Sequence, residues 1–75
     1  MFFKPLIEDW GVAALATDLE LPVKNVRRWC DLDSIPADWF AAVARVAPRR
    51  GRRHITVKHL ADLAERRRLA KRDAA

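Results

Sequence analysis

Apolar residues recur along this chain every three or four positions, which is the spacing of one buried face on an amphipathic helix. Four residues follow this spacing in the first half: Val12, Leu15, Ala16 and Leu19. Two later segments repeat it: Phe40, Val43, Ala44 and Ala47, and then Val57, Leu60, Ala61 and Ala64. The pattern predicts an all-α fold.

Prolines and a glycine mark where the helices begin and end. Pro5, Pro22 and Pro36 each suit the first turn of a helix, because that turn does not need the amide proton that proline lacks. Gly11 lets the chain turn, and Pro48 ends a helix. Together with the apolar spacing, these residues predict five helices over residues 6–10, 12–19, 22–30, 36–47 and 57–69.

The third of these helices has two chemically different sides. Its apolar side carries Val26, Trp29 and Cys30, which we expect in the core. Its opposite side carries Lys24, Arg27 and Arg28, with Asn25 at the edge. A short helix with a cationic front, braced by a second helix, suits the DNA major groove. Arginine or lysine can bond guanine there and asparagine can bond adenine, so we expect base contacts from Lys24, Asn25, Arg27 and Arg28.

Residues 12–30 resemble the helix-turn-helix of Cro-like phage repressors, including the YdaS-type branch. The matching residues are Ala16, where two helices would cross, and Leu19, Leu21, Val26 and Trp29. The Ile35-Pro36 pair that follows also fits the family, and the resemblance extends to about residue 47. The chain departs from the pattern at Glu20, where the family usually has a glycine in the left-handed conformation.

The resemblance implies a small five-helix DNA-binding domain. It implies a phage or prophage type of transcriptional repressor, which binds a two-fold operator in double-stranded DNA as a homodimer and blocks polymerase sterically. An antitoxin-like branch of the family is a related possibility. In this motif the first helix crosses the phosphate backbone, so Thr17 is expected at a phosphate.

Charge is distributed unevenly along the 75 residues, whose net charge is +5. Residues 1–44 hold four basic and seven acidic residues, whereas residues 45–75 hold eleven basic and three acidic ones. A polyanionic partner explains such a bias. In the loop PRRGRRH we expect backbone phosphate contacts from Arg49, Arg50, Arg52 and Arg53, although a solvated loop is an equal alternative. Arg66, Arg67 and Arg68 are expected to add affinity without sequence information.

The length predicts one domain, with residues 1–70 as the DNA-binding domain and residues 71–75 as a disordered basic tail. One cysteine allows no internal disulfide and fits a reducing cytoplasm, with the protein associated with the nucleoid. No segment has the length and apolarity of a membrane span, and the N-terminus does not resemble a secretory signal. His54 and His59 do not match the spacing of metal ligands, and we expect no metal, no cofactor and no enzymatic activity.

A protein-interaction module is the alternative from another class. In it, a broad face around Trp39 and Phe40 would bind a partner, and the basic C-terminal half would bind nucleic acid without specificity. For Trp39 burial and a dimer contact remain equal expectations. Asp31 and Asp33 lie in a turn, where carboxylates commonly accept hydrogen bonds from backbone amides.

Overall fold

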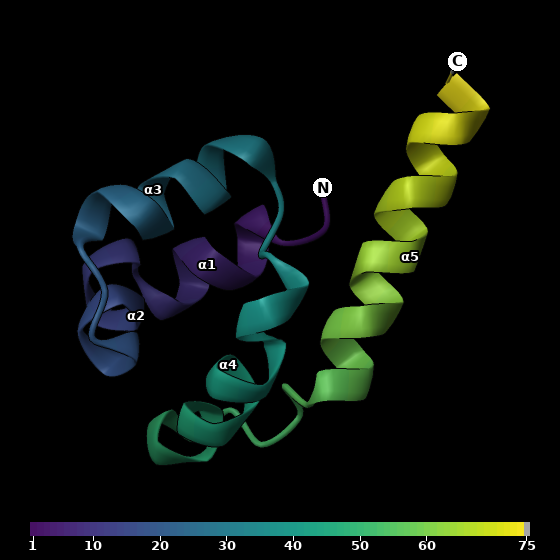
Figure 1. Cartoon of the computed structure of the whole chain (residues 1–75). Coiled ribbons are helices and arrows are strands. Elements are labelled where there is room, and N and C mark those ends of the chain that lie inside the picture. Colours follow the sequence, from purple (N-terminus) through teal and green to yellow (C-terminus); the bar gives the residue numbers. More distant parts are fainter. Residues whose placement is uncertain (75) are drawn as a thin grey trace.

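The described residues form five α-helices, and the prediction of a small all-α domain is confirmed. The computed structural model describes residues 1–74, and the side chains of residues 1–72. The helices are α1 (Lys4–Trp10), α2 (Val12–Leu19), α3 (Val23–Leu32), α4 (Phe40–Val46) and α5 (Val57–Ala74) (Figure 1). Two 3-10 turns flank α4: η1 (Ala37–Trp39) and η2 (Ala47–Arg50).

The helix starts differ slightly from those expected at the prolines. Pro22 lies just before α3 with an extended ψ of 141°, so α3 begins at Val23 and not at the proline. Pro36 likewise precedes η1, and the α-helix proper begins only at Phe40. A 3-10 turn commonly precedes an α-helix, so the chain enters α4 through one tighter turn.

The last helix is longer than the sequence predicted. It continues to Ala74, so residues 71–74, expected as part of a disordered tail, are helical. Ala75 lies outside the described residues. Alanine, arginine and lysine have high helix propensity, and cations near a helix C-terminus interact favourably with its dipole. Local propensity therefore extends α5 beyond the residues that pack on the core.

Three segments end in the left-handed conformation. Glu20 (φ 57°), Asp33 (φ 53°) and Gly51 (φ 71°) follow α2, α3 and η2, respectively. After α2, the Leu21 amide donates to the Ala16 carbonyl at 2.9 Å, which is the long hydrogen bond of a Schellman ending. Glu20 thus adopts the conformation that a glycine usually takes in this turn, at a cost of about 1 kcal/mol.

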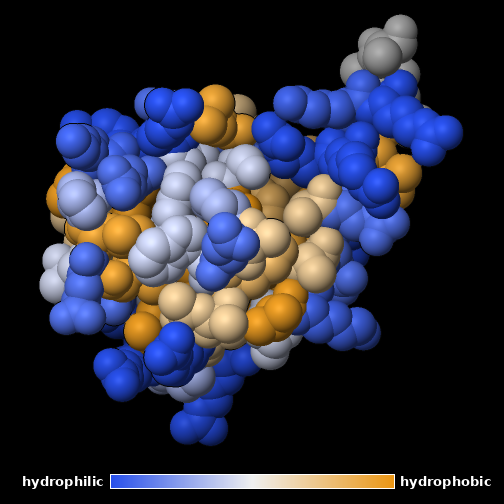
Figure 2. Space-filling view, in the orientation of Figure 1, coloured by the Kyte–Doolittle hydropathy of each residue, from blue (hydrophilic) through white to orange (hydrophobic). Residues whose placement is uncertain are grey.

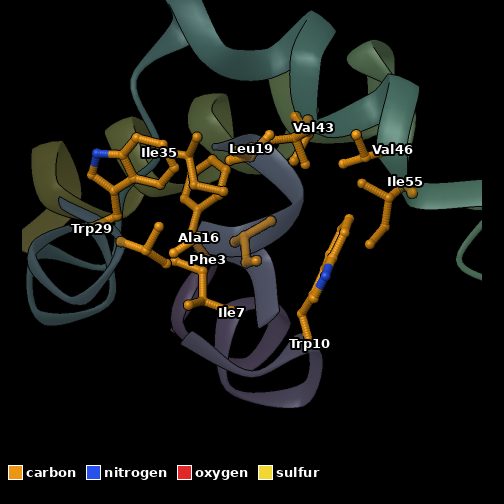
Figure 3. Close-up of a cluster of buried hydrophobic side chains, with 14 of the residues drawn as sticks. Phe3, Ile7, Trp10, Ala16, Leu19, Trp29, Ile35, Val43, Val46 and Ile55 are labelled. Atoms are coloured by element: carbon orange, nitrogen blue, oxygen red, sulfur yellow. The ribbon is translucent and has the colours of Figure 1, made fainter. Parts of the chain in front are cut away.

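The core draws side chains from all five helices and from both chain segments around α4. Phe3, Ile7, Leu15, Val26, Val43 and Leu60 are completely buried. Phe3 stacks on Phe40 with ring centroids 6.2 Å apart, and Ile55 approaches Trp10 from the loop before α5 (Figure 3). The core therefore joins the first residues of the chain to α4, and the packed half of α5 covers its side.

Candidate nucleic-acid interface

The exposed side of α3 carries the cations that the sequence pattern placed there. Val26, Trp29 and Cys30 face the core, which confirms the predicted apolar side. Lys24, Arg27 and Arg28 are exposed, and none of them forms an ion pair within the described residues. Together with Asn25 and Asp31 they line a shallow, open depression on the outer side of the helix. The four predicted base-contact residues thus share one surface.

The neighbouring helix α2 sets the orientation of α3. Ala16 is completely buried, and its small side chain allows the two helices to approach closely. The left-handed Glu20 reverses the chain between them, as a helix-turn-helix requires. Thr17 is exposed on α2. A ten-residue α-helix is about 15 Å long, so α3 presents roughly three turns to solvent.

Arg50, one of the predicted phosphate contacts, is engaged within the fold. Its Nε and Nη2 atoms donate to Oδ2 and Oδ1 of Asp18, both at 2.8 Å. Asp18 also accepts a hydrogen bond from Trp10 Nε1 at 2.9 Å. The hydrogen bonds from Arg50 lower the pKa of Asp18 against a smaller opposing effect of burial. The ion pair ties η2 to α1 and α2.

Arg52 is engaged in the same region. It forms an ion pair with the Asp9 carboxylate, and its Nη2 atom donates to the Asp9 carbonyl at 3.0 Å. Its guanidinium carbon also lies 5.7 Å from the centroid of the Trp10 ring. Among the four loop arginines, only Arg49 and Arg53 are exposed without an ion pair in the described residues.

The loop and α3 lie at opposite ends of the molecule. Figure 1 shows α3 along the top, with η2 and the following loop at the bottom. The predicted base contacts and the predicted loop contacts are therefore not brought together on one surface. The C-terminal part of α5, in contrast, rises to the level of α3 and extends beyond it (Figure 1).

No protein-family model matches this chain, and no curated protein or solved structure is found to be similar to it.

Two long-range contacts within the fold could not be recognised from local patterns in the sequence. Asp33 accepts hydrogen bonds from the amides of Phe2, Phe3 and Lys4 at 2.8–3.1 Å, and so binds the start of α1. Arg67 donates from Nη2 to the Leu32 carbonyl at 3.1 Å, and so joins α5 to the end of α3. The turn position of Asp33 indicated bonding to amides, but neither partner could be identified, because each lies about 30 residues away.

The face around Trp39 and Phe40 is largely used inside the fold. Phe40 is buried, and Trp39 is half-buried with its ring 5.9 Å from that of Trp29. Cys30 is buried with a free thiol, and burial raises the pKa of that thiol. These positions match the expectation that Phe40 and Cys30 belong to the core.

The described part of the chain has neither a metal-binding cluster nor a membrane-spanning helix. Its residues contain no cluster of three histidine, cysteine, aspartate or glutamate side chains that could hold a metal ion. His54 and His59 lie edge to face with centroids 5.9 Å apart. None of the described helices combines the length and the apolarity needed to cross a membrane.

Proposed function

We propose that this protein is a sequence-specific, double-stranded DNA-binding regulator that inserts α3 into the major groove. On this proposal it is a binding protein and not an enzyme. It acts as a phage-type repressor in the cytoplasm, as a homodimer on a two-fold site. Occupation of a promoter excludes polymerase and so represses transcription.

One observation carries this proposal. The cationic groups of Lys24, Arg27 and Arg28 lie exposed on one side of α3 and without carboxylate partners in the described part of the chain. The first 44 residues carry more acidic than basic side chains, yet three of their four basic residues lie together on this one short helix. A polyanion with a groove about 12 Å wide matches both the charge and the width of such a helix.

The geometry supports a division of roles along α3. Lys24 and Arg28 are four residues apart and so lie on one line of the helix, one turn from each other. Either side chain can donate to O6 and N7 of guanine, whereas Asn25 can pair with adenine. On this proposal Thr17, which is exposed on α2, contacts a phosphate and so positions α3 without adding sequence information.

Selection of bound sites from a random duplex library tests the proposal. We expect a consensus with two-fold symmetry, and Arg28→Ala should weaken binding to it by about 1–3 kcal/mol and relax the preference at one base pair. Lys24→Ala should relax a different position. Both side chains are exposed, so circular dichroism spectra and melting curves should match those of the parent protein.

Asp31→Asn serves as the control, because Asp31 is exposed at the same helix but is acidic and repels phosphate. Removal of the negative charge of Asp31 should slightly strengthen binding to all duplexes. If the selection returns no consensus, or if Lys24→Ala and Arg28→Ala retain the full base preference, the proposal is wrong.

The protein-interaction alternative is separated by the same experiments. It requires a free face at Trp39 and Phe40, but these side chains pack on Trp29 and Phe3. Under that alternative, binding to duplexes would be independent of sequence and of α3. It would fall only when cations of the C-terminal half are removed.

A further inference from the structure

The C-terminal part of α5 extends away from the rest of the molecule. Leu60 is completely buried, and Leu63 and Ala64 are half-buried, so the first half of the helix packs on the core. From Glu65 onward most side chains are exposed. Figure 1 shows that the last turns pass the level of α3 and have no neighbouring element there. We name residues 65–72 the C-terminal arm.

The arm is joined to the end of the candidate recognition helix. Arg67 is the half-buried residue of the arm, and its Nη2 atom donates to the carbonyl of Leu32, the last residue of α3. This bond satisfies a carbonyl at the C-terminus of α3, where a cation is also favoured by the helix dipole. The position of the arm is therefore coupled to the position of α3.

The arm carries five cations: Arg66, Arg67, Arg68, Lys71 and Arg72. At 100° per residue, Arg68, Lys71 and Arg72 lie within an arc of about 100° on one side of the helix. Glu65 is the only acidic residue of the arm, and it pairs with Arg68 at 3.3 Å, with both side chains mostly exposed. Figure 2 shows hydrophilic side chains over α3 and over the end of α5, with a small hydrophobic patch between the two groups at the upper edge of the molecule.

From this arrangement we infer that the C-terminal arm binds the phosphate backbone of the duplex beside the groove that α3 occupies. The inference rests on the proposed function and adds a second contact surface to it. A duplex placed on the outer side of α3 lies next to the arm, because the arm extends past α3 on that side. The same duplex lies away from the loop that carries Arg49 and Arg53, which is at the other end of the molecule.

Two matched double variants test the inference. Arg68→Gln/Arg72→Gln and Arg49→Gln/Arg53→Gln each remove two exposed cations, so they lower the net charge equally. Removal of one cation that binds a phosphate lowers the log–log salt slope of binding by about 0.9. We expect the arm variant to lower the slope by about 1.8, and to weaken the selected duplex and a random duplex by similar factors, on the order of sixtyfold at 0.1 M salt. The loop variant should change both quantities much less.

Glu65→Gln provides a test in the opposite direction. It removes the acidic group of the arm and frees Arg68, so binding to both duplexes should become tighter. Equal losses of affinity in the arm and loop variants, an unchanged slope in the arm variant, or a loss of affinity confined to the selected duplex would each overturn the inference. The proposed function would survive these outcomes, because it depends on base preference and on α3. A parent protein without base preference would instead contradict the proposed function.

Discussion

Asp33 shows how one side chain can organise a distant part of the chain. It ends α3 in the left-handed conformation, which aspartate and asparagine tolerate better than most residues. Its carboxylate then accepts the amides of Phe2, Phe3 and Lys4, which are the unpaired donors at the start of α1. The single residue thus caps a helix that begins 29 positions earlier and has no side-chain cap of its own.

Asp33→Asn should destabilise the protein at neutral pH by about 1–2 kcal/mol, because it keeps the shape and the left-handed conformation but removes the charge. Burial of the Asp33 carboxylate raises its pKa, but the bonds from three backbone amides outweigh burial, so the net pKa is lowered. Because the pKa is lowered, the ionised Asp33 carboxylate contributes fully to the free energy of unfolding above the pKa of an unfolded aspartate, about 3.9. This contribution is lost as the pH falls through the pKa of Asp33 in the folded protein.

Thermal melts of both proteins across a pH series check this. The melting temperature of Asp33→Asn should be lower by about 5–10 °C at pH 7, and the difference should shrink toward zero as the pH falls through the lowered pKa of Asp33 in the folded protein. Asp31→Asn removes an equivalent charge two residues earlier, where the described residues provide no hydrogen-bond partner. It should melt like the parent protein. A difference that persists unchanged in acid would exclude an ionised carboxylate as the cause.

At the scale of elements, the loop after α4 has a structural role that its composition hides. Four arginines around one glycine resemble a solvated or phosphate-binding loop. The acidic residues of α1 and α2 bind two of them, since Asp18 pairs with Arg50 and Asp9 with Arg52. Asp18 is largely shielded from solvent, which makes its ion pair stronger than a fully exposed one.

Arg50→Gln should therefore lower the melting temperature by an amount on the order of a few degrees, since it breaks a two-point contact with Asp18. Arg49→Gln, at the neighbouring exposed position, should leave the melting temperature unchanged. A double-mutant cycle of Arg50→Gln with Asp18→Asn measures the coupling between the two side chains. Strictly additive losses of stability in that cycle would show that the pair contributes nothing to stability.

At the scale of the whole molecule, folding brings acidic residues of the first half of the chain against arginines of the second half. The acidic first half supplies carboxylate partners to two of the four loop arginines, Arg50 and Arg52. The cations on the outer side of α3, and all those of the C-terminal arm except Arg68, form no ion pair with a described residue. The chain is small, so a single packed core holds these surfaces in their relative positions. Loss of that core would separate them.

Trp29→Ala tests this dependence on the core. Trp29 is 7% exposed and packs against Trp39, on the side of α3 away from the cations. Removing its ring should destabilise the protein by about 3–5 kcal/mol, which is a large part of the stability of so small a domain. The melting temperature should fall by more than about 12 °C. Trp39→Ala should have a smaller effect, because Trp39 is only half-buried.

If Trp29→Ala melted like the parent but no longer bound the duplex, Trp29 would be part of the binding surface and not of the core. Circular dichroism at 222 nm and a duplex titration on the same sample distinguish these outcomes. The expected result is a joint loss of helix and of binding.

The sequence by itself determined the features of this protein that depend only on residues close together in the chain. The apolar spacing of residues 12–19, the apolar and cationic sides of α3, and the capping of α5 by Thr56, whose hydroxyl accepts the His59 amide, depend on neighbours within one or two helical turns. Such relations are fixed by helix geometry, so they are visible in the sequence. The resemblance to Cro-like repressors rests on the same local features and remains a hypothesis.

Only the tertiary structure decided which cationic side chains pair with carboxylates inside the fold and which stay free to bind a partner. Arg50 and Arg52 differ little in sequence context from Arg49 and Arg53, yet only the first two meet carboxylates, 32 and 43 positions away. Asp33, Arg67 and the place of the arm beside α3 likewise depend on contacts across about 30 residues or more. Side-chain spacing carries no information at that range, because the relative positions of helices are set by how their buried faces pack together.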